Sequence, residues 1–315
     1  MLQRYHWPMI PLGQYPAPSH VIAHISDTHF LGEGRQLFGV VETEANLRQA
    51  LTQLTRLSGK PEAIVITGDL ADLGEPDAYS RLRAIVEPVA AELGAQLIWV
   101  MGNHDERGPY NQGLFDGEHT DEPQDRVYDV NGLRVISLDS TVQGYHHGAI
   151  SDEQLAWLAA ELATPAPHGT ILALHHPPVP TPLLWAMEML ELQGQSDLAA
   201  VLQGSDVRAI LAGHLHYSSF STFAGIPVSV ASATCYTLAL AAEDRLLSGN
   251  NENQAFNMVH LYDDSVVHSI VPLGDETEVS GFATAFAPQI IAMTPEQRLE
   301  MFSSKTSDFN TAQNG

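Results

Sequence analysis

The sequence predicts an α/β domain in which helices cover the faces of sheets. Short apolar runs that are typical of buried strands alternate with longer segments of helical apolar spacing, and this alternation begins at residue 20. Beyond about residue 226 the strand-like runs follow one another without a helix between them. The alternation indicates helix-covered strands, and the later runs favour a mixed sheet or two sheets packed face to face.

The expected strands are short runs of apolar residues. They are residues 21–25, 63–67, 96–101, 126–130, 133–138, 170–174, 207–212, 226–231, 256–262 and 266–271. Asn131 and Gly132 stand between two of these runs, and this pair strongly favours a two-residue hairpin turn. We therefore expect residues 126–138 to form a β-hairpin.

The expected helices show helical apolar spacing. They are residues 42–57, 75–93, about 152–163, 182–192 and 197–202. The first is followed by Gly59, and Pro88 predicts a kink or a break in the second. Ser151 and Gln154 form a capping box that opens the third. Residues 238–253 are expected to form a loop.

Composition divides the chain into three parts. Residues 1–19 are rich in proline and are expected to be an irregular arm on the surface or on a partner. Residues 20–273 form the main domain, and residues 274–315 form a polar, acidic tail with no clean pattern. The arm is a candidate for self-association into a homo-oligomer, a dimer or larger.

The balance of charges argues against a nucleic-acid partner. The 315 residues include 14 Lys or Arg and 38 Asp or Glu, which gives a net charge of −24. Nucleic-acid binding depends on basic side chains that neutralise phosphates, so a DNA or RNA strand would be repelled. With 44% hydrophobic residues the chain can build a full core, and a small substrate is favoured.

Three further features favour a soluble, cytoplasmic protein. Cys235 is the single cysteine, so no intramolecular disulfide can form, which fits a reducing compartment. The first twenty residues lack the charged start and apolar stretch of a secretory signal peptide. No apolar run reaches about 18 residues, the length of a membrane span, so no span is expected.

Seven potential metal ligands occur in short clusters, most of which lie at the end of an apolar run. The clusters are I-S-D-T-H with Asp27 and His29, T-G-D with Asp69, G-N-H-D with Asn103, A-L-H-H-P-P with His175, and G-H-L-H with His214 and His216. In open α/β sheets, ligands bind beyond the carboxyl ends of the strands, so these side chains are expected to converge on one rim. Gly68, Gly102 and Gly213 each precede a ligand, where glycine permits a tight turn and close approach.

The types and spacing of these residues point to a particular chemistry. In a D-x-H or H-x-H pair just past a strand, both side chains point the same way because strand side chains alternate. The set contains nitrogen and oxygen ligands and no sulfur, which suits Fe, Mn, Zn or Co. Such a set can hold two metal ions side by side. The sequence therefore predicts metal-assisted hydrolysis of a phosphate ester.

These motifs, in this order and with these flanking glycines, resemble those of the calcineurin-like metallophosphoesterases. Within that family, T-G-D-L-A-D-L-G-E, M-G-N-H-D and A-G-H-L-H-Y are similar to the bacterial class III 3′,5′-cyclic AMP phosphodiesterases, especially the mycobacterial and corynebacterial enzymes. The resemblance covers residues 20–272. It implies a four-layer α/β/β/α sandwich with two mixed sheets, in which residues 20–273 are the catalytic domain.

The resemblance also implies a two-metal centre in which Asp69 bridges the ions. The first metal would be held by Asp27, His29, Asp69 and His216. The second would be held by Asp69, Asn103, His175 and His214. All seven ligands of the family's motifs are present in this chain. As a neutral ligand, Asn103 would leave its metal free to polarise a phosphoryl oxygen.

The implied activity is hydrolysis of 3′,5′-cyclic AMP to 5′-AMP. A hydroxide shared by metals about 3.5–4 Å apart would attack phosphorus in line with the leaving oxygen. His104 is expected to protonate or stabilise the departing ribose oxygen, and Asp72 is expected to orient His104. The expected substrate contacts come from Asn103, His104, His147 and His216.

Other residues receive plainer interpretations. His24 is expected to be a hydrogen-bonded core residue, and His146 and His176 to be structural or rim residues. A purine base could stack on Tyr217 or on Tyr236, and the sequence does not choose between them.

Two alternative functions remain open at this point. A broad-specificity phosphodiesterase would act on 2′,3′-cyclic nucleotides, glycerophosphodiesters or aryl phosphodiesters, because the metals recognise only the phosphate. A non-catalytic interaction scaffold would belong to a different class, and metal content would exclude it. A protein phosphatase is disfavoured, because L-A-D-L-G after Asp69 lacks the arginine that such enzymes place near their metals.

Overall fold

The structure, a computed structural model, describes residues 12–274, 279, 281 and 283–312. The chain divides into two compact units, one of residues 18–274 and one that contains the described residues on either side. The larger unit contains all the predicted ligands. It is built on two large mixed sheets, one of five strands and one of six.

The first sheet has the strand order β13-β12-β1-β2-β3. Its strands are β1 (His20–Ile25), β2 (Ala63–Thr67), β3 (Gln96–Val100), β12 (Ala255–Leu261) and β13 (Val266–Pro272). β1, β2 and β3 run parallel, whereas β12 is antiparallel to β1 and β13 to β12. The three parallel strands therefore end at one edge of the sheet.

Three helices cover the outer face of this sheet, namely α1 (Thr43–Leu54), α2 (Pro76–Leu93) and α3 (Arg107–Phe115). Their apolar residues recur at helical spacing, which gives each helix one face to bury. Leu47 and Leu51 of α1 and Leu82 of α2 are buried in one cluster with Ile64 and Ile66 of β2. This cluster forms the core between the helices and the first sheet.

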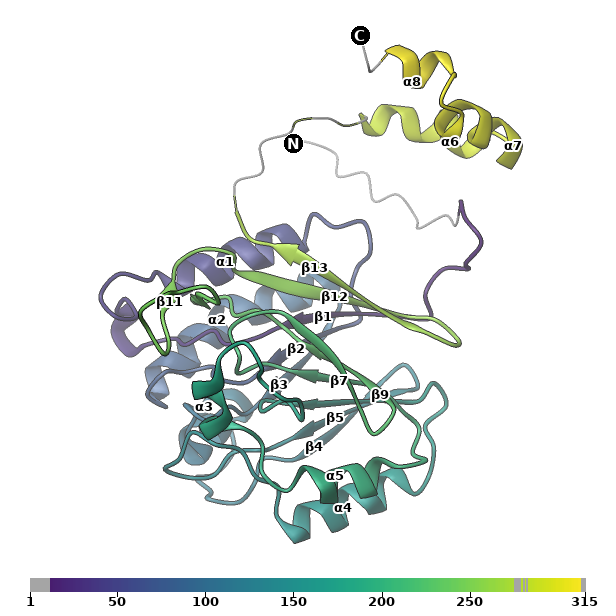
Figure 1. Ribbon diagram of the computed structural model, residues 1–315. Coiled ribbons are helices and arrows are strands. Elements are labelled where there is room, and N and C mark those ends of the chain that lie inside the picture. Colours follow the sequence, from purple (N-terminus) through teal and green to yellow (C-terminus); the bar gives the residue numbers. More distant parts are fainter. Residues whose placement is uncertain (1–11, 275–278, 280, 282, 313–315) are drawn as a thin grey trace. The chain divides into compact units, whose positions relative to one another are not determined.

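The second sheet has the strand order β4-β5-β6-β7-β9-β8. Its strands are β4 (Arg126–Val130), β5 (Leu133–Leu138), β6 (Thr170–Leu174), β7 (Val207–Ala212), β8 (Ser219–Phe223) and β9 (Ile226–Val230). The four central strands run parallel, and antiparallel β4 and β8 form the edges. α4 (Asp152–Leu162) and α5 (Gln195–Leu202) lie side by side (Figure 1) and contribute to the core on the outer face.

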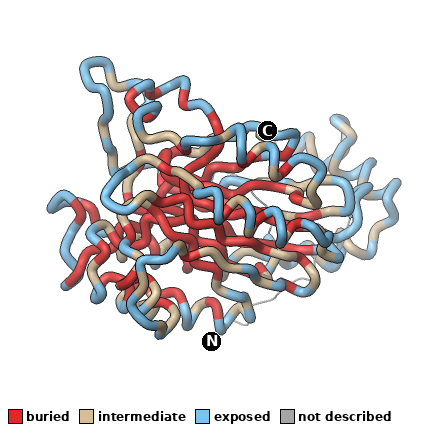
Figure 2. The backbone as a smooth tube through the Cα atoms, turned by 90° about the horizontal axis from the view of Figure 1, so that it is seen from below, coloured by how far each residue is buried: buried red, intermediate tan, exposed pale blue. Residues whose placement is uncertain are grey.

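The two sheets face each other across a third apolar core. Ile22 and Val65 of the first sheet share one buried cluster with Val135, Ile171 and Leu211 of the second. Figure 2 shows these central strands almost entirely in the colour of buried residues, with exposed segments mainly in the loops and outer helices. Since each strand buries both faces, its sequence is an almost continuous apolar run. The predicted four-layer α/β/β/α sandwich is confirmed.

Several elements have the bounds that the sequence predicts. Strands β2, β4, β5, β6 and β7 agree at both ends. Asn131 and Gly132 have φ values of 53° and 91°, which a type I′ hairpin turn requires. Ser151 and Gln154 form both hydrogen bonds of the capping box that opens α4. These elements depend on local sequence, which explains the agreement.

The structure also differs from the predictions in a few places. α2 continues through Pro88 without a break, because Leu82, Ile85, Val86 and Ala90 anchor the helix on the sheet. Such packing can outweigh the cost of proline inside a helix, about 3 kcal/mol. Within residues 182–192 only Trp185–Leu190 is helical, as the 3₁₀-helix η2.

Other elements were not predicted. α3 contains two glycines and a proline, and the mostly exposed edge strand β8 lacks an apolar run. The expected loop at 238–253 includes a two-residue pairing between β10 (Thr237–Leu238) and β11 (Gly249–Asn250). A short 3₁₀-helix, η1 (Gly32–Gly34), follows β1.

The described part of the tail contains short helices where the sequence shows no clean pattern. They are η3 (Thr284–Phe286), α6 (Ala287–Ala292), α7 (Pro295–Arg298), the π-helical turn η4 (Leu299–Ser303) and α8 (Asp308–Ala312). Thr294 and Gln297 form a capping box at the start of α7. The described part of the arm, residues 12–19, is irregular, and the rest of it lies outside the described residues.

None of the helices in the described part of the chain has both the length and the apolar composition that crossing a bilayer requires.

Candidate metal centre

The seven predicted ligands lie on loops that follow the carboxyl ends of five parallel strands. Asp27 and His29 follow β1, Asp69 follows β2 and Asn103 follows β3, all in the first sheet. His175 follows β6, and His214 and His216 follow β7, in the second sheet. Because the two sheets face each other, their ligand loops meet at one rim.

The backbone of these loops is unusual. Asp27, His29, Asp69, His214 and His216 all have positive φ, between 45° and 72°. Residues other than glycine rarely adopt this left-handed region, and each such residue costs on the order of 1–3 kcal/mol. Strain of this kind clusters at functional sites, where the surrounding structure holds it in place.

Two of the flanking glycines are required by close approach. A Cβ atom on Gly102 would lie 2.0 Å from the backbone nitrogen of Asp69, and one on Gly213 would lie 1.9 Å from Oγ of Ser26. Neither distance is sterically possible. The backbone of one ligand loop therefore packs directly on the backbone or side chain of the next, as the sequence predicted from these glycines.

One group of ligand atoms comes from Asp27, His29, Asp69 and His216. Each residue offers one atom, and these atoms all lie within 4.8 Å of one another. Nε2 of His29 is 3.2 Å from Nε2 of His216 and 3.4 Å from Oδ2 of Asp69. Ligands about 2.1 Å from a shared ion lie about 3.0–3.4 Å from their neighbours, so the spacing fits a metal ion.

A second group lies against the first. Nε2 of His175 is 3.2 Å from Oδ2 of Asp69 and 3.1 Å from Oδ1 of Asn103. The ring of His214 lies 5.1 Å from the ring of His175, between centroids. The same oxygen of Asp69 therefore faces His29 of the first group and His175 of the second. A ligand that bridges two ions would occupy such a position.

Each of the four histidines uses its outer ring nitrogen to hold its orientation. Nδ1 of His29 lies 2.8 Å from Oδ1 of Asp72, and Nδ1 of His175 lies 2.7 Å from the carbonyl oxygen of Thr67. Nε2 of His214 lies 3.0 Å from the carbonyl oxygen of Leu190, and Nδ1 of His216 lies 2.9 Å from that of Tyr236. Such second contacts fix the tautomer and leave the other nitrogen free for a metal.

The two carboxylates of the cluster are buried, and their field favours positive charge. Asp27 is 0% exposed and Asp69 is 2% exposed. Burial lowers the pKa of His29, but hydrogen bonds to Asp69 and Asp72 outweigh this effect and raise the pKa to about 10. Burial likewise opposes charge on His175, yet the charge of Asp69 raises its pKa to about 9. A bound cation would supply the positive charge that this field favours.

Asp105 supports the ligand loops, a role that was not predicted from the sequence. Its buried carboxylate accepts hydrogen bonds from the backbone N–H groups of Leu70, Ala71 and Gly102, at 2.9–3.1 Å. It also accepts one from the hydroxyl of Tyr79. Asp105 thus joins the loop of Asp69 to the loop of Asn103. Its place in the G-N-H-D motif was the available sequence clue.

His104 lies beside the cluster and is partly exposed, with 30% of its side chain accessible. Its backbone N–H donates to Oδ1 of Asp69 at 2.8 Å, and its Nδ1 lies 2.9 Å from the carbonyl oxygen of Asp72. The Asp72 carboxylate lies 3.5 Å from the same Nδ1 but 2.8 Å from Nδ1 of His29. Asp72 therefore contacts His104 mainly through its main chain and supports His29 with its side chain.

In the loop at 145–148, His146 contacts the ligand cluster, whereas the sequence led us to expect His147 near the substrate. Nδ1 of His146 lies 2.9 Å from Nδ2 of Asn103, and its ring lies 4.9 Å from that of His104. The neighbouring His147 packs edge-on against Tyr145, at 5.3 Å between ring centroids. The structure thus shows His146, expected to be a structural or rim residue, in contact with a predicted ligand.

Two buried histidines have supporting positions. Both ring nitrogens of His176 are engaged, one with Oγ of Ser140 at 2.8 Å and one with the carbonyl oxygen of His146 at 3.2 Å. His24 lies 2.9 Å from Oγ1 of Thr67 through Nε2, while its Nδ1 has no hydrogen-bond partner among the described residues. Only one of the two ring nitrogens of this core histidine is therefore hydrogen-bonded.

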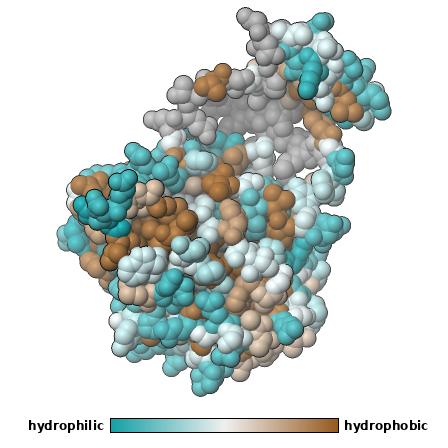
Figure 3. All heavy atoms as spheres, in the orientation of Figure 1, coloured by the Kyte–Doolittle hydropathy of each residue, from teal (hydrophilic) through white to brown (hydrophobic). Residues whose placement is uncertain are grey.

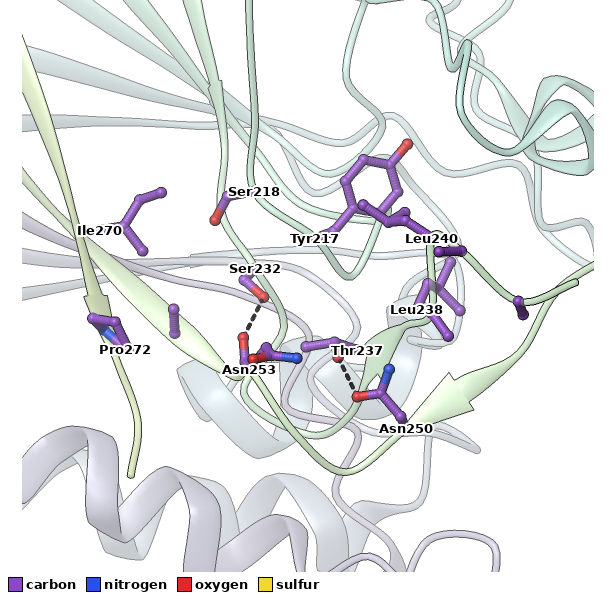
Figure 4. Close-up of a pocket in the computed structure, with 14 residues that line it drawn as sticks. Tyr217, Ser218, Ser232, Thr237, Leu238, Leu240, Asn250, Asn253, Ile270 and Pro272 are labelled. Atoms are coloured by element: carbon purple, nitrogen blue, oxygen red, sulfur yellow. Dashed lines mark hydrogen bonds between the residues drawn. The ribbon is translucent and has the colours of Figure 1, made fainter. Parts of the chain in front are cut away.

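A separate cavity of about 690 Å³ lies between β13 of the first sheet and residues 237–242. Figure 4 shows Tyr217, Leu238 and Leu240 along one side of it, and Ile270 and Pro272 along the other. None of the predicted metal ligands lines this cavity. The ring of Tyr217, which is buried, thus belongs to this cavity.

Comparison with known proteins establishes the family. A model of the calcineurin-like phosphoesterases matches residues 20–218. The chain is 56% identical over 266 residues to a probable cyclic nucleotide phosphodiesterase of Rhodococcus erythropolis, covering 84% of this chain and 88% of that one. It is 54% identical over 271 residues to a cAMP/cGMP dual specificity phosphodiesterase of Mycobacterium tuberculosis, covering 86% and 85%.

A solved structure shows the same fold. A dimetal phosphatase from Danio rerio superposes with a TM-score of 0.58 at 16% identity, covering 81% of this chain and 99% of that one. The chain belongs to the calcineurin-like phosphoesterase family, and the prediction of a metallophosphoesterase is confirmed.

We predict that Asp105→Ala destabilises the protein by about 3 kcal/mol, because it leaves several buried N–H groups without an acceptor. Tyr79→Phe is the matched control, since it removes a hydroxyl partner of Asp105 and leaves its three backbone contacts. Urea unfolding measures both changes, and elemental analysis measures bound metal. Equal destabilisation by the two variants would contradict the assigned role of Asp105.

Proposed function

We propose that this chain hydrolyses 3′,5′-cyclic AMP to 5′-AMP at a centre of two metal ions. The observation that carries the proposal is the position of Oδ2 of Asp69, which faces both His29 and His175. One group of ligands on each side of a shared oxygen suits a pair of ions. The choice of a cyclic nucleotide is supported by the names of the two similar bacterial enzymes.

The residues present fit a pair of metals. Asp27, His29, Asp69 and His216 would hold one ion, and Asp69, Asn103, His175 and His214 the other. Fe, Mn, Zn and Co all suit this set of nitrogen and oxygen donors. When bound, a pair of such ions polarises a phosphoryl oxygen and provides a nucleophile at neutral pH. Two carboxylates leave two divalent cations with net positive charge, so the centre attracts a phosphodiester despite the acidic surface.

His104 is placed to assist the leaving group. Its Nδ1 donates to the carbonyl oxygen of Asp72, so Nε2 is the ring atom that can carry a proton to the substrate. Hydrolysis breaks the bond between phosphorus and the 3′ oxygen of ribose, and this oxygen must gain a proton. Because the backbone N–H of His104 is bonded to Asp69, the ring is held beside the ligand cluster.

A second candidate function is hydrolysis of other small phosphodiesters, cyclic GMP in particular. The dual specificity of the mycobacterial relative favours this candidate. The described ligand groups recognise a phosphate and not a base, so the centre by itself does not restrict the substrate. A non-catalytic scaffold is the alternative of another class. An assembly of two or more chains and a cytoplasmic location remain predictions.

Product analysis of the metal-loaded protein tests the proposed function. We expect 3′,5′-cyclic AMP to give 5′-AMP, and to be preferred when 2′,3′-cyclic AMP competes. Manganese, iron, zinc and cobalt forms should be assayed in parallel, with cyclic GMP and an aryl phosphodiester as further substrates. Preferred cleavage of the 2′,3′ isomer or of the aryl diester would replace the proposal by the broad-specificity function, and no turnover with bound metal would favour a scaffold.

Asn103→Ala is predicted to lower both metal content and turnover, because it removes a neutral oxygen ligand from the second group. We expect a loss of about 10–100-fold in metal affinity or activity. His146→Ala is the matched control, since it removes the contact to the amide nitrogen of Asn103 and the ring contact with His104 but leaves the amide oxygen of Asn103 in place. Calorimetric metal titration and initial rates measure both. Unchanged metal binding and turnover in Asn103→Ala would refute its assignment as a ligand.

His104→Ala is predicted to slow cyclic AMP hydrolysis by about 10²–10⁴-fold, the usual contribution of a general acid. The loss should be much smaller for bis(4-nitrophenyl) phosphate, because a nitrophenolate leaves without protonation. Metal content should stay at the wild-type value, since the ring lies outside both ligand groups. An equal loss of rate for both substrates would show that His104 does not act on the leaving group.

A further inference from the structure

A short loop presents an exposed aromatic ring near the metal centre. Leu37 and Val41 exchange two backbone hydrogen bonds of 3.0 Å, which closes a three-residue tip of Phe38, Gly39 and Val40. Phe38 is 71% exposed and Val40 is 70% exposed. Phe38 also has a φ of 53°, which is an outlier for an aromatic residue. The protein thus holds an apolar ring in solvent in a strained conformation.

The loop has a firm base. Leu37 and Val41 are buried in one cluster with Leu31, Ala233 and Cys235, against which Tyr236 packs. The backbone of Cys235 is in turn bonded to the carbonyl oxygen of Asp27, a predicted ligand. The exposed position of Phe38 is therefore fixed relative to the metal centre.

Tyr236 connects the loop to the centre. Its ring lies 4.4 Å from the ring of His216 and 6.2 Å from that of His29, between centroids. It also contacts the ring of Phe38, at 5.4 Å between centroids and an interplanar angle of 73°. The backbone of Gly249 packs so closely on Tyr236 that a Cβ atom there would lie 2.9 Å from the ring. Tyr236 is thus braced, and the face open to a ligand belongs to Phe38.

Further apolar side chains lie in this region, beside the exposed charged residues Glu243, Asp244 and Arg245. Figure 3 shows apolar side chains gathered near the part of the fold where Figure 1 labels β11. Leu240, Leu246 and Leu247, in the segment between β10 and β11, are all exposed. Charged groups for binding a second phosphate are absent from the tip of the loop. An apolar, aromatic surface next to a phosphate site suits a planar heterocycle attached to that phosphate through a sugar.

We infer that Phe38, braced by Tyr236, is the surface on which the base of a bound cyclic nucleotide stacks, a role that rests on the proposed function. Two rings that meet at a steep angle offer a face for stacking and an edge for a second contact. Stacking is tolerant of sequence because every base has a flat face. A purine of either kind can therefore bind, and Tyr217, buried at the separate cavity, takes no part.

The test compares cyclic AMP with ribose 3′,5′-cyclic phosphate, which carries the same phosphodiester and no base. In the metal-loaded wild type, kcat/KM should be clearly higher for cyclic AMP. Phe38→Ala is expected to lower the ratio of the two kcat/KM values about ten-fold, mainly through KM for cyclic AMP, as loss of one stacking contact predicts. Val40→Ala, equally exposed on the same loop, should keep the wild-type ratio.

The outcomes separate the inference from the proposed function. If the wild type hydrolyses cyclic AMP but Phe38→Ala and Val40→Ala have the same ratio, the stacking role is wrong and the proposed function stands. Equal kcat/KM for both substrates in the wild type would also overturn the stacking role. If the wild type hydrolyses neither substrate, the proposed function fails and the inference fails with it. Inhibition by 5′-AMP, compared with ribose 5-phosphate, should show the same dependence on Phe38.

Discussion

Two buried carboxylates, Asp27 and Asp69, set the constraint on which the rest of this site depends. A buried charge costs several kcal/mol unless it is paired and hydrogen-bonded. Both oxygens of Asp27 accept the backbone N–H of His214, and Oδ1 of Asp69 accepts that of His104. Oδ2 of Asp69 faces His29 and His175, and Oδ1 of Asp27 also faces His216. These acids are thus tolerated because loops from both sheets bring donors, and room for cations, to them.

The backbone is shaped by the same constraint. To bring the N–H of His214 onto Asp27, the loop after β7 must pass so close to Ser26 that only glycine fits at position 213. The left-handed conformations of five ligand residues have the same origin, since they turn side chains inward over a very short length of chain. The cost of this strain is offset by the apolar core between the sheets, which ends directly beneath the ligands.

The proposed function assigns recognition of the phosphate and recognition of the base to different parts of the site. The groups proposed to bind metals and a phosphate stand at the ends of buried strands, where the sheets fix their positions. The aromatic surface at Phe38 and Tyr236 stands on loops outside the sheets. Loops tolerate change far better than buried strands, so this division allows one metal centre to serve enzymes with different substrates.

The sequence by itself determined the elements whose cause is local. Apolar runs predicted β2, β6 and β7 at their observed bounds, the Asn131–Gly132 pair predicted a hairpin, and Ser151 with Gln154 predicted a helix start. The ligand motifs and their flanking glycines could be read in the same way, because each lies within a few residues of a strand end. The family followed from their order along the chain.

Only the tertiary structure decided the roles that depend on residues far apart in the chain. α3 contains glycines and a proline, and it is helical because it packs on α2. Asp105 joins two ligand loops because donors from both loops and from Tyr79 converge on its carboxylate. Differences in position on the scale of an ångström decide whether the side chain of Asp72 supports His29 or His104. They also decide whether His146 or His147 contacts the ligand cluster. Local sequence fixes which groups are available, whereas the packing of the two sheets fixes the distances between them, and chemistry depends on those distances.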